Sequence, residues 1–240
     1  MELTRIGRPD AAIFDFDGVI VDTEPLHYRA FLAILAPLGL GFSWPEYVER
    51  YMGFDDRDAF TEAFRARGLP LDERRRKKLV EAKGEVFREV IRQGVKAYPG
   101  AVAMVAALHE RGIPLAISSG ALRDDILQIV RDLGIAPFFR EIVSADDVPR
   151  SKPDPECYRL AYERLARAFP DRITVPGRCL AIEDTPAGIR AAKGAGLLVL
   201  AVTHTHPASE LAGADYRVES LEKVFFGAGP GGSPESGSRA

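Results

Sequence analysis

The stretch AAIFDFDG, residues 11–18, joins a short apolar run to two acids and a glycine. A run of four apolar residues is typical of a strand that is buried on both faces of a parallel sheet. Alternation along the extended chain turns Asp15 and Asp17 to the same side, where their repulsion favours a cation or a shared proton between them. Because ligands bind where the strands of an open parallel sheet end, and because Asp can act as a covalent nucleophile, the stretch predicts a reactive site.

The composition is that of an ordinary globular protein. The chain has 240 residues, of which 46% are hydrophobic and 28% charged, and its net charge is −3. This length fits one large domain, or one domain with a smaller insert. The negative charge disfavours nucleic acid and anionic membranes as main partners. The basic run 74–78 is surrounded by acids, so we interpret it as the solvated face of a helix.

We expect no targeting segment, no membrane span and no disulfide. The first ten residues lack the pattern of a signal peptide, and no apolar segment is long enough to cross a bilayer. Cys157 and Cys179 lack metal-ligand spacing, so we interpret both as reduced thiols. The expected protein is cytoplasmic, and a monomer or a weak dimer.

Strand-like and helix-like patterns alternate through the second half of the chain. Apolar runs predict strands at 114–117, 141–144, 179–182 and 197–202, and spacings of three and four predict helices at 101–111, 123–133, 155–168 and 187–195. Such alternation implies a parallel sheet with right-handed crossovers. The predicted fold class is therefore α/β, with a Rossmann-like, doubly wound parallel sheet as its core.

The segment that follows the first strand is different, because it shows helical patterns alone. Helices are predicted at 27–38, 44–51, 56–67 and 72–93. We expect an α/β core of residues 1–23 and 96–226, a helical cap of residues 24–95, and a flexible Gly/Pro/Ser-rich tail of residues 227–240. Such a cap would act as a lid that excludes water and selects the substrate.

Four polar clusters each lie at the end of a predicted strand. They are residues 15–23, residues 118–120, residues 151–155 and residues 183–188. Singly, each has a structural interpretation: Ser118 and Ser119 could cap a helix, and Lys152 could be an exposed loop residue. Together they favour a function, because the carboxyl ends of parallel strands converge on one crevice.

Phosphoryl transfer is the chemistry that needs this set. Mg²⁺ prefers hard oxygen ligands, which Asp15, Asp184 and a backbone carbonyl near Asp17 could supply. Phosphate oxygens need donors, which Lys152 could supply together with the Ser118 hydroxyl and the N–H groups around Ser119 and Gly120. Asp15 would attack phosphorus in line, while Asp17 would protonate the leaving oxygen and later activate water.

The chain resembles the haloacid dehalogenase-like (HAD) hydrolase superfamily, in the helical-cap subgroup that includes β-phosphoglucomutase and phosphoglycolate phosphatase. The matching motifs are Asp15-x-Asp17-Gly18-Val19-x-Val21-Asp22-Thr23, Ser118-Ser119-Gly120, Ser151-Lys152-Pro153-x-Pro155 and Glu183-Asp184-Thr185-x-Ala187-Gly188. The resemblance implies an aspartyl-phosphate intermediate and a Mg²⁺ cofactor. It implies catalytic roles for Asp15, Asp17 and Lys152, metal binding by Asp15, Asp17 and Asp184, phosphate binding by Ser118, Ser119 and Gly120, and a supporting role for Glu183.

The resemblance also points to three residues outside the core. Thr23 would belong to the hinge, and His27 and Arg57 would contact the substrate from the cap. Each of the last two has a structural alternative, since a histidine on an amphipathic helix is often packed, and Arg57 stands among acids with which it could pair.

The predicted function is a Mg²⁺-dependent phosphatase that hydrolyses a small phosphomonoester, a sugar phosphate or a similar metabolite. True dehalogenases resemble this chain in the nucleophile but lack the second acid, so Asp17 favours phosphate chemistry. The alternative is a β-phosphoglucomutase-like isomerase, whose cap would keep water from the phosphorylated aspartate. A third hypothesis, a non-catalytic binding module, is disfavoured because Asp15, Asp17, Lys152 and Asp184 are all present.

Overall fold

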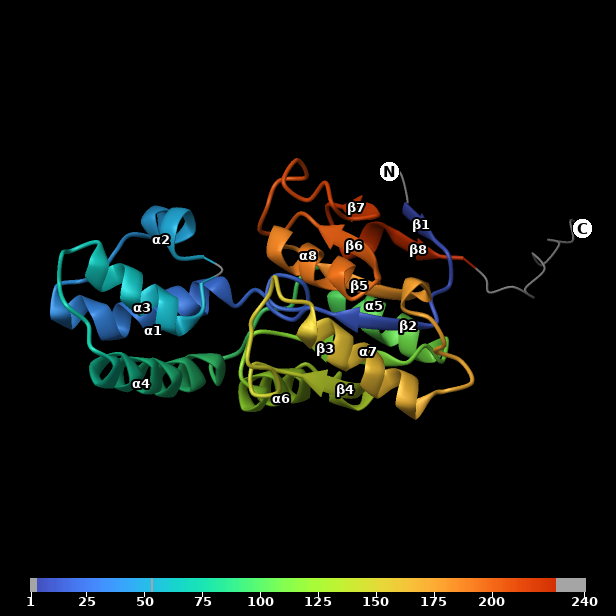
Figure 1. Cartoon of the computed structure of the whole chain (residues 1–240), viewed down its shortest axis with the longest axis horizontal. Helices are drawn as coiled ribbons and strands as arrows, with labels where there is room; N and C mark the ends of the chain where they lie inside the picture. The colour runs from blue at the N-terminus through green and yellow to red at the C-terminus, as the bar shows by residue number, and fades with distance from the viewer. Residues whose placement is uncertain (1–3, 53, 228–240) are drawn as a thin grey trace, which may run out of the picture. The chain divides into compact units, whose positions relative to one another are not determined.

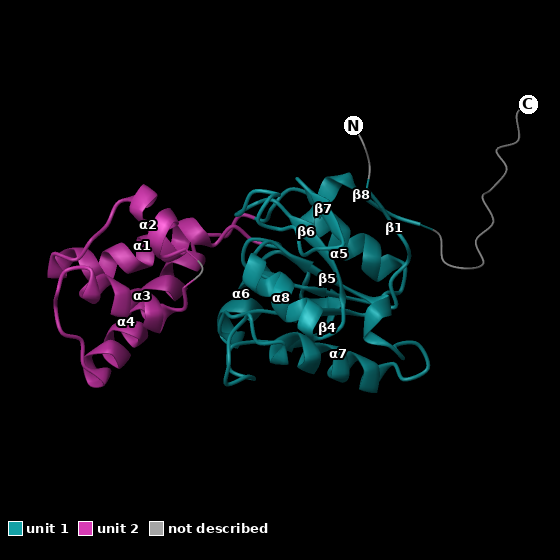
Figure 2. Cartoon of the chain, turned by 45° about the horizontal axis from the view of Figure 1, so that its top comes forward, with its two compact units in different colours: residues 1–20, 97–240 teal, residues 21–96 magenta. Residues whose placement is uncertain are grey.

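The chain divides into two compact units, residues 1–20 with 97–240 and residues 21–96 (Figure 2). The structure is a computed structural model that describes residues 4–52 and 54–227. The predicted flexible tail, residues 227–240, lies outside the described residues apart from Gly227. Within the described ranges, no helix combines the length and the apolar character that a membrane span requires.

The first unit is built on a six-stranded parallel sheet in the order β4-β3-β2-β5-β6-β7 (Figure 1). Its strands are β2 (Ala11–Phe14), β3 (Leu115–Ser118), β4 (Phe139–Val143), β5 (Cys179–Glu183), β6 (Leu198–Val202) and β7 (Tyr216–Val218). In β2, Ile13 pairs with Ala116 on one side and Ala181 on the other. The chain changes direction across the sheet at β2, so the end of β2 is the topological switch point at which ligands bind.

Helices cover this sheet. They are α5 (Ala101–Glu110), α6 (Arg123–Asp132), α7 (Glu156–Ala168) and α8 (Pro186–Gly194). On one face of the sheet, Ile13 and Ala181 pack against Tyr158 and Leu165 of α7 and Ile189 of α8, and α5 lies on the other face (Figure 1). The buried residues of α7 recur at helical spacing, which makes one side of the helix apolar. The predicted α/β, doubly wound parallel core is confirmed.

Three strands were not predicted from the sequence. β1 (Thr4–Ile6) and β8 (Val224–Phe226) form a separate two-stranded parallel sheet, and β7 adds an edge to the main sheet. Each of the three is only three residues long. A segment this short shows no periodicity, and its strand conformation depends on the neighbour with which it pairs.

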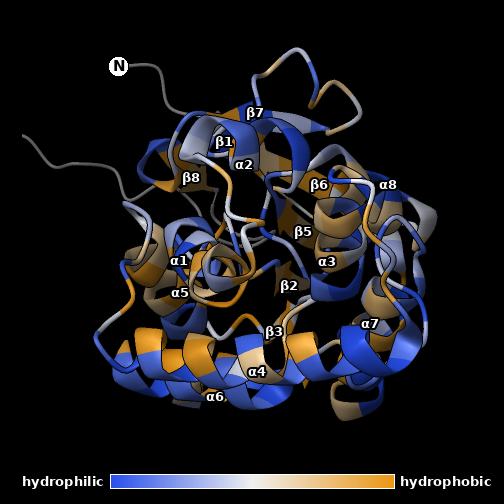
Figure 3. Ribbon diagram, turned by 90° about the vertical axis from the view of Figure 1, so that its left-hand side faces the viewer, coloured by the Kyte–Doolittle hydropathy of each residue, from blue (hydrophilic) through white to orange (hydrophobic). Residues whose placement is uncertain are grey.

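The second unit is entirely helical over its described residues. Its helices are α1 (Glu24–Leu35), α2 (Trp44–Arg50), α3 (Asp56–Arg65) and α4 (Glu73–Ile91). The side chains of Ser43, Asp55 and Asp72 accept the N–H three residues ahead and cap α2, α3 and α4. α4 is amphipathic, with hydrophobic and hydrophilic colours on opposite sides of its ribbon (Figure 3). The predicted small helical insertion is confirmed.

The first helix of this unit differs from its predicted range of 27–38. α1 begins at Glu24, because Pro25 lacks only an N–H that the first turn of a helix leaves unpaired. It ends at Leu35, where Ala36–Leu38 tighten into a 3-10 turn with Pro37 in its first positions. Both differences follow from where proline is tolerated in a helix.

Candidate active site

A buried ion-pair cluster lies at the end of β2. The Lys152 ammonium is 2.8 Å from Asp15 Oδ1 and 2.6 Å from Glu183 Oε1. Asp15 follows β2 and Glu183 is the last residue of the adjacent strand β5, so the sheet itself brings the two carboxylates together. Lys152 precedes α7 and lies between them. The structure therefore joins three of the four predicted clusters at one point.

Glu183 is fully buried, and its carboxylate is held by five donors. Oε1 accepts from Lys152 Nζ and from the Tyr158 hydroxyl at 2.8 Å. Oε2 accepts from Asp184 N, Thr185 N and Thr185 Oγ1, at 3.1 to 3.3 Å. A Cβ at Gly188 would lie 1.8 Å from Oε1, so only glycine at this position leaves room for the Glu183 carboxylate. These contacts engage both carboxylate oxygens of Glu183 and place one of them beside Lys152, while its supporting role in catalysis stays a prediction.

Asp184 is buried beside Glu183 and offers one open oxygen. The Thr205 hydroxyl donates to its Oδ2, whereas its Oδ1 has no hydrogen-bond partner within residues 4–52 and 54–227. Gly18 has a positive φ of 81°, and a Cβ there would lie 2.0 Å from Oδ2. Glycine after Asp17 is therefore required both by the backbone conformation and by the approach of Asp184.

The cluster carries more negative than positive charge. Burial and the Glu183 carboxylate raise the pKa of Asp15 to about 7, although Lys152 opposes the shift. Burial, followed by Glu183 and Asp15, raises the pKa of Asp184 well above its usual range. Burial lowers the pKa of Lys152, but the attraction of Asp15 and Glu183 outweighs it and raises this pKa above its ordinary value. A further positive charge at the site would stabilise all three ionised acids.

The donor set fits a hard divalent cation. Asp15, Glu183 and Asp184 each offer a carboxylate oxygen, and these oxygens lie within 4.8 Å of one another. Since both Glu183 oxygens are already engaged by protein donors, Asp15 and the open Oδ1 of Asp184 remain as ligands. Buried polar atoms normally have a partner, so the unpaired oxygen itself indicates an external ligand. Oxygen ligands of this kind suit Mg²⁺.

Residues 118–120 lie at the end of β3, the other neighbour of β2. Ser118 is fully buried, its hydroxyl has no oxygen or nitrogen partner in the part of the chain that the structure describes, and the Cys157 thiol lies beside it. The Ser119 hydroxyl accepts from Ala121 N at 2.9 Å and donates to Asp17 Oδ2 at 3.4 Å. A Cβ at Gly120 would meet nothing within 4 Å. Phosphate binding by Ser118, Ser119 and Gly120 stays a prediction.

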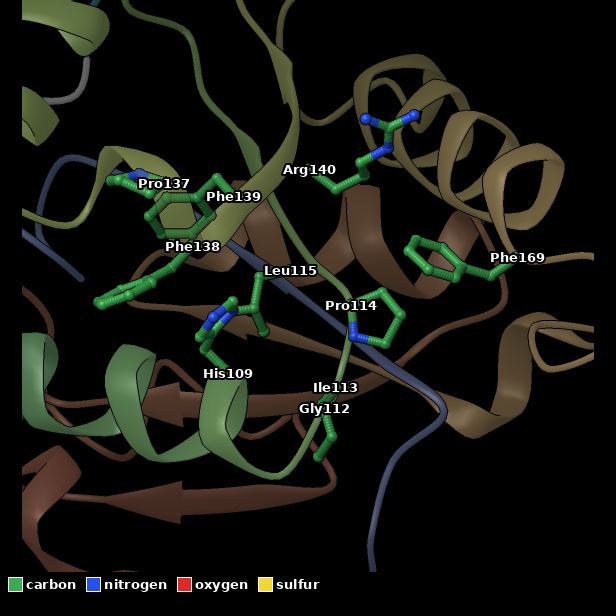
Figure 4. A pocket seen from close by; sticks show the side chains of 10 residues that line it. All are labelled: His109, Gly112, Ile113, Pro114, Leu115, Pro137, Phe138, Phe139, Arg140 and Phe169. Atoms are coloured by element: carbon green, nitrogen blue, oxygen red, sulfur yellow. The ribbon is translucent and has the colours of Figure 1, made fainter.

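A cavity of about 330 Å³ lies at the opposite end of the sheet, where β3 and β4 begin (Figure 4). Its wall includes His109, Phe138, Arg140 and Phe169, and His109 packs on Phe138 with ring centroids 4.6 Å apart. None of the predicted site residues belongs to this wall. The cavity lies at the amino ends of the strands, away from the switch point.

A family model described as haloacid dehalogenase-like hydrolase matches residues 12–202. The chain belongs to this family. A Thermotoga maritima protein named phosphorylated carbohydrates phosphatase is 31% identical over 189 residues, which cover 78% of this chain and 82% of the relative. The prediction of a phosphoric monoester hydrolase of the haloacid dehalogenase-like family is confirmed.

Solved structures of the family share the fold. A mutant of CbbY from Rhodobacter sphaeroides, in complex with xylulose-(1,5)bisphosphate, has a TM-score of 0.79 and 29% identity and covers 91% of this chain and 97% of its own. A structure described as a β-phosphoglucomutase of Thermotoga maritima has a TM-score of 0.69 and 28% identity and covers 89% and 95%. This hydrolase is therefore similar both to a sugar-bisphosphate binder and to a mutase-like protein.

The remaining predicted residues belong to the second unit. Thr23 is fully buried and precedes α1. Arg57 forms an exposed ion pair with Asp55 at 3.0 Å, the structural alternative that its sequence context offers. His27 Nδ1 is 2.7 Å from the Lys83 ammonium, and the His27 ring stacks on Phe87 with centroids 4.2 Å apart.

Lys83 is a buried cation that the sequence analysis missed. It is 2% exposed, pairs with Asp56 Oδ1 at 2.7 Å and lies 4.8 Å from the ring centres of Phe31 and Phe87. Burial and the Lys83 charge lower the pKa of His27 well below its usual value, so His27 is neutral and its Nδ1 accepts a hydrogen bond from the Lys83 ammonium. On a charged amphipathic helix, nothing in the sequence distinguishes Lys83 from its solvated neighbours.

Two segments of the first unit also escaped the sequence analysis. Thr205 holds Asp184, and His204 stacks on Tyr98 and contacts the Gly18 carbonyl at 2.8 Å through Nδ1. These residues belong to a polar run that follows β6, a fifth strand end, and the rule applied to the other strands would have found them. Tyr158 lies on the apolar side of α7, where a tyrosine is indistinguishable from an ordinary core residue.

Proposed function

We propose that this chain is a Mg²⁺-dependent phosphatase that hydrolyses a phosphorylated sugar or a similar small metabolite through an aspartyl phosphate on Asp15. The observation that carries the proposal is the buried cluster at the switch point, where Lys152 bridges Asp15 and Glu183 and Asp184 offers an open oxygen. Phosphoryl transfer uses a nucleophile, a cation beside it and carboxylate oxygens that can bind a metal, and this cluster offers all three.

The proposed reaction has two displacements. Asp15 attacks the phosphorus atom and the bond to the leaving oxygen breaks, while Asp17 gives that oxygen a proton. Asp17 then takes a proton from water as the water attacks phosphorus, and cleavage of the bond to Asp15 releases phosphate. Lys152 keeps Asp15 oriented throughout and donates to a phosphoryl oxygen, as does Ser118. Mg²⁺ held by Asp15, Asp184 and the Asp17 carbonyl would neutralise charge on the phosphoryl group.

The substrate class is supported by the relatives. One is named for its action on phosphorylated carbohydrates, and another binds a ketose bisphosphate in its crystal structure. We therefore propose a sugar phosphate for this chain as well. Thr23 as a hinge residue, and His27 and Arg57 as substrate contacts, remain predictions.

A panel of sugar phosphates, assayed for phosphate release with and without Mg²⁺, tests the proposal. We expect Mg²⁺-dependent release that Asp15→Asn abolishes, because an amide cannot attack phosphorus. The matched control is Asp10→Asn, at the other end of the same strand, where the half-buried Asp10 pairs with the exposed Arg178 at 2.7 Å. This control should keep full activity, because Asp10 lies at the end of the strand opposite to the site and the amide can still accept from Arg178. Activity retained by Asp15→Asn would overturn the assignment.

Similarity to a mutase-like structure calls for one further assay. The protein is incubated with β-glucose 1-phosphate and a trace of the corresponding bisphosphate. A phosphatase releases phosphate and free sugar, whereas formation of glucose 6-phosphate would replace the hydrolase assignment with the isomerase.

A further inference from the structure

Tyr158 contacts both partners of the central ion pair. It lies on α7 and is fully buried, its hydroxyl is 2.8 Å from Glu183 Oε1, and the Lys152 ammonium is 4.9 Å from the centre of its ring. The hydroxyl is therefore placed where it can influence how Glu183 holds Lys152.

The Tyr158 hydroxyl and Lys152 share one carboxylate oxygen. An ionised carboxylate only accepts, so the hydroxyl donates to Oε1, at which the ammonium also donates from 2.6 Å. The second donor takes up part of the negative charge of Oε1 and so weakens the pull of Glu183 on Lys152. The ammonium is then shared with Asp15, which it reaches at 2.8 Å.

The ring of Tyr158 restricts the position of the Lys152 ammonium. A cation over an aromatic face is attracted to it, and the attraction is stronger in a site without water. Of the three ammonium protons, one is directed to Asp15 and one to Glu183, which leaves the third for a phosphoryl oxygen. The ring and the two carboxylates together fix the nitrogen.

We propose that Tyr158 is a positioning residue, which acts through Glu183 and through its own ring to hold the Lys152 ammonium against Asp15 during phosphoryl transfer. The inference rests on the proposed phosphatase function and adds a residue to it. Tyr158 does not take part in the chemistry itself. Its loss should weaken stabilisation of the transition state more than it weakens the fold.

The test compares Tyr158→Phe with Tyr162→Phe, one turn further along α7, where the tyrosine is half-buried and packs against the same core. Three quantities are measured: kcat and KM for a sugar phosphate that the wild type hydrolyses, the inhibition constant of orthovanadate, and the midpoint of thermal unfolding. Vanadate imitates the five-coordinate phosphorus of the transition state. Its inhibition constant is a property of the folded molecules and does not change when part of the protein unfolds.

For Tyr158→Phe we expect kcat to fall about tenfold and the vanadate constant to rise by a similar factor, which is the loss of one hydrogen bond to a charged group. KM should change much less, and Tyr162→Phe should match the wild type. In a Glu183→Gln background, Tyr158→Phe should add little, because its target is then already neutral.

Two results would overturn the inference while leaving the phosphatase intact. One is a Tyr158→Phe variant with wild-type kcat and vanadate binding. The other is a fall in kcat with an unchanged vanadate constant and a lower unfolding midpoint, which would make Tyr158 a purely structural residue. A wild-type protein that neither hydrolyses the ester panel nor binds vanadate would instead refute the proposed function, and this inference with it.

Discussion

Replacing Gly188 by alanine should be severely damaging, for a reason that the structure makes quantitative. The added Cβ would lie 1.8 Å from Glu183 Oε1, 1.9 Å from Cδ and 2.1 Å from Oε2. Ordinary contact between such atoms needs about 3.5 Å, so the carboxylate has to move by roughly 1.5 Å. That shift breaks hydrogen bonds from at least two of its five donors, each of which contributes about 1.5–3 kcal/mol for a charged acceptor. We therefore expect the free energy of unfolding to fall by about 3–6 kcal/mol, and turnover to be lost.

Gly84→Ala is the matched control for this substitution. Gly84 is also helical, but a Cβ there meets only Arg88 Nη1 at 3.5 Å, an ordinary contact. Alanine in a helix interior is favoured over glycine by up to about 1 kcal/mol, so this variant should be at least as stable as the wild type. Urea unfolding followed by circular dichroism measures both variants, and fluorescence of Trp44, the single tryptophan, follows the unit that contains Gly84. Wild-type stability and turnover in Gly188→Ala would refute the described environment of Glu183.

Three further predictions concern Mg²⁺ binding by Asp15 and Asp184 and the protonation of His27. Burial raises the pKa of Asp15 to about 7 and that of Asp184 above its usual range, so Mg²⁺ must displace a proton when it binds. The affinity for Mg²⁺ should therefore increase as the pH is raised towards 7, by up to about tenfold per pH unit, and calorimetry should detect proton release on binding; an affinity that does not change with pH contradicts this. Thr205→Val removes the donor to Asp184 and should weaken Mg²⁺ binding about tenfold at fixed pH, whereas unchanged affinity would exclude Thr205 as a support. Burial and Lys83 lower the pKa of His27 in the folded state below 6.5, so the unfolded state binds more protons below about pH 6.5. As the pH falls below this value, the wild type should lose up to about 1.4 kcal/mol of stability per pH unit relative to His27→Gln. Parallel plots of stability against pH for the two proteins would refute a neutral His27.

Much of the fold follows from local patterns. The apolar run before Asp15, and the runs at β3, β5 and β6, are long and β-rich enough to be recognised without any knowledge of their neighbours. The helices of the second unit begin at side chains that cap them, such as Ser43 and Asp72, which the sequence displays openly. By contrast, β1, β7 and β8 exist only because another strand lies beside them.

The site shows a similar division. Residues that follow strands could be located by topology alone, because parallel strands deliver their carboxyl ends to one edge, and Asp15, Lys152 and Glu183 do meet there. Tyr158 and Lys83 could not be located, since each lies on a helix where its residue type has a more common explanation. Their roles depend on three-dimensional neighbours, a charged pair for Tyr158 and two aromatic rings for Lys83.

The central claim is that Asp15 becomes phosphorylated during turnover. The direct measurement mixes the enzyme with a sugar phosphate that it hydrolyses and Mg²⁺, quenches the reaction in the steady state, and reduces the sample with borohydride, which converts an acyl phosphate of aspartate into homoserine. Peptide mass spectrometry should find homoserine at position 15, dependent on both substrate and Mg²⁺. Efficient turnover without homoserine at position 15, or homoserine at another aspartate, would contradict the account.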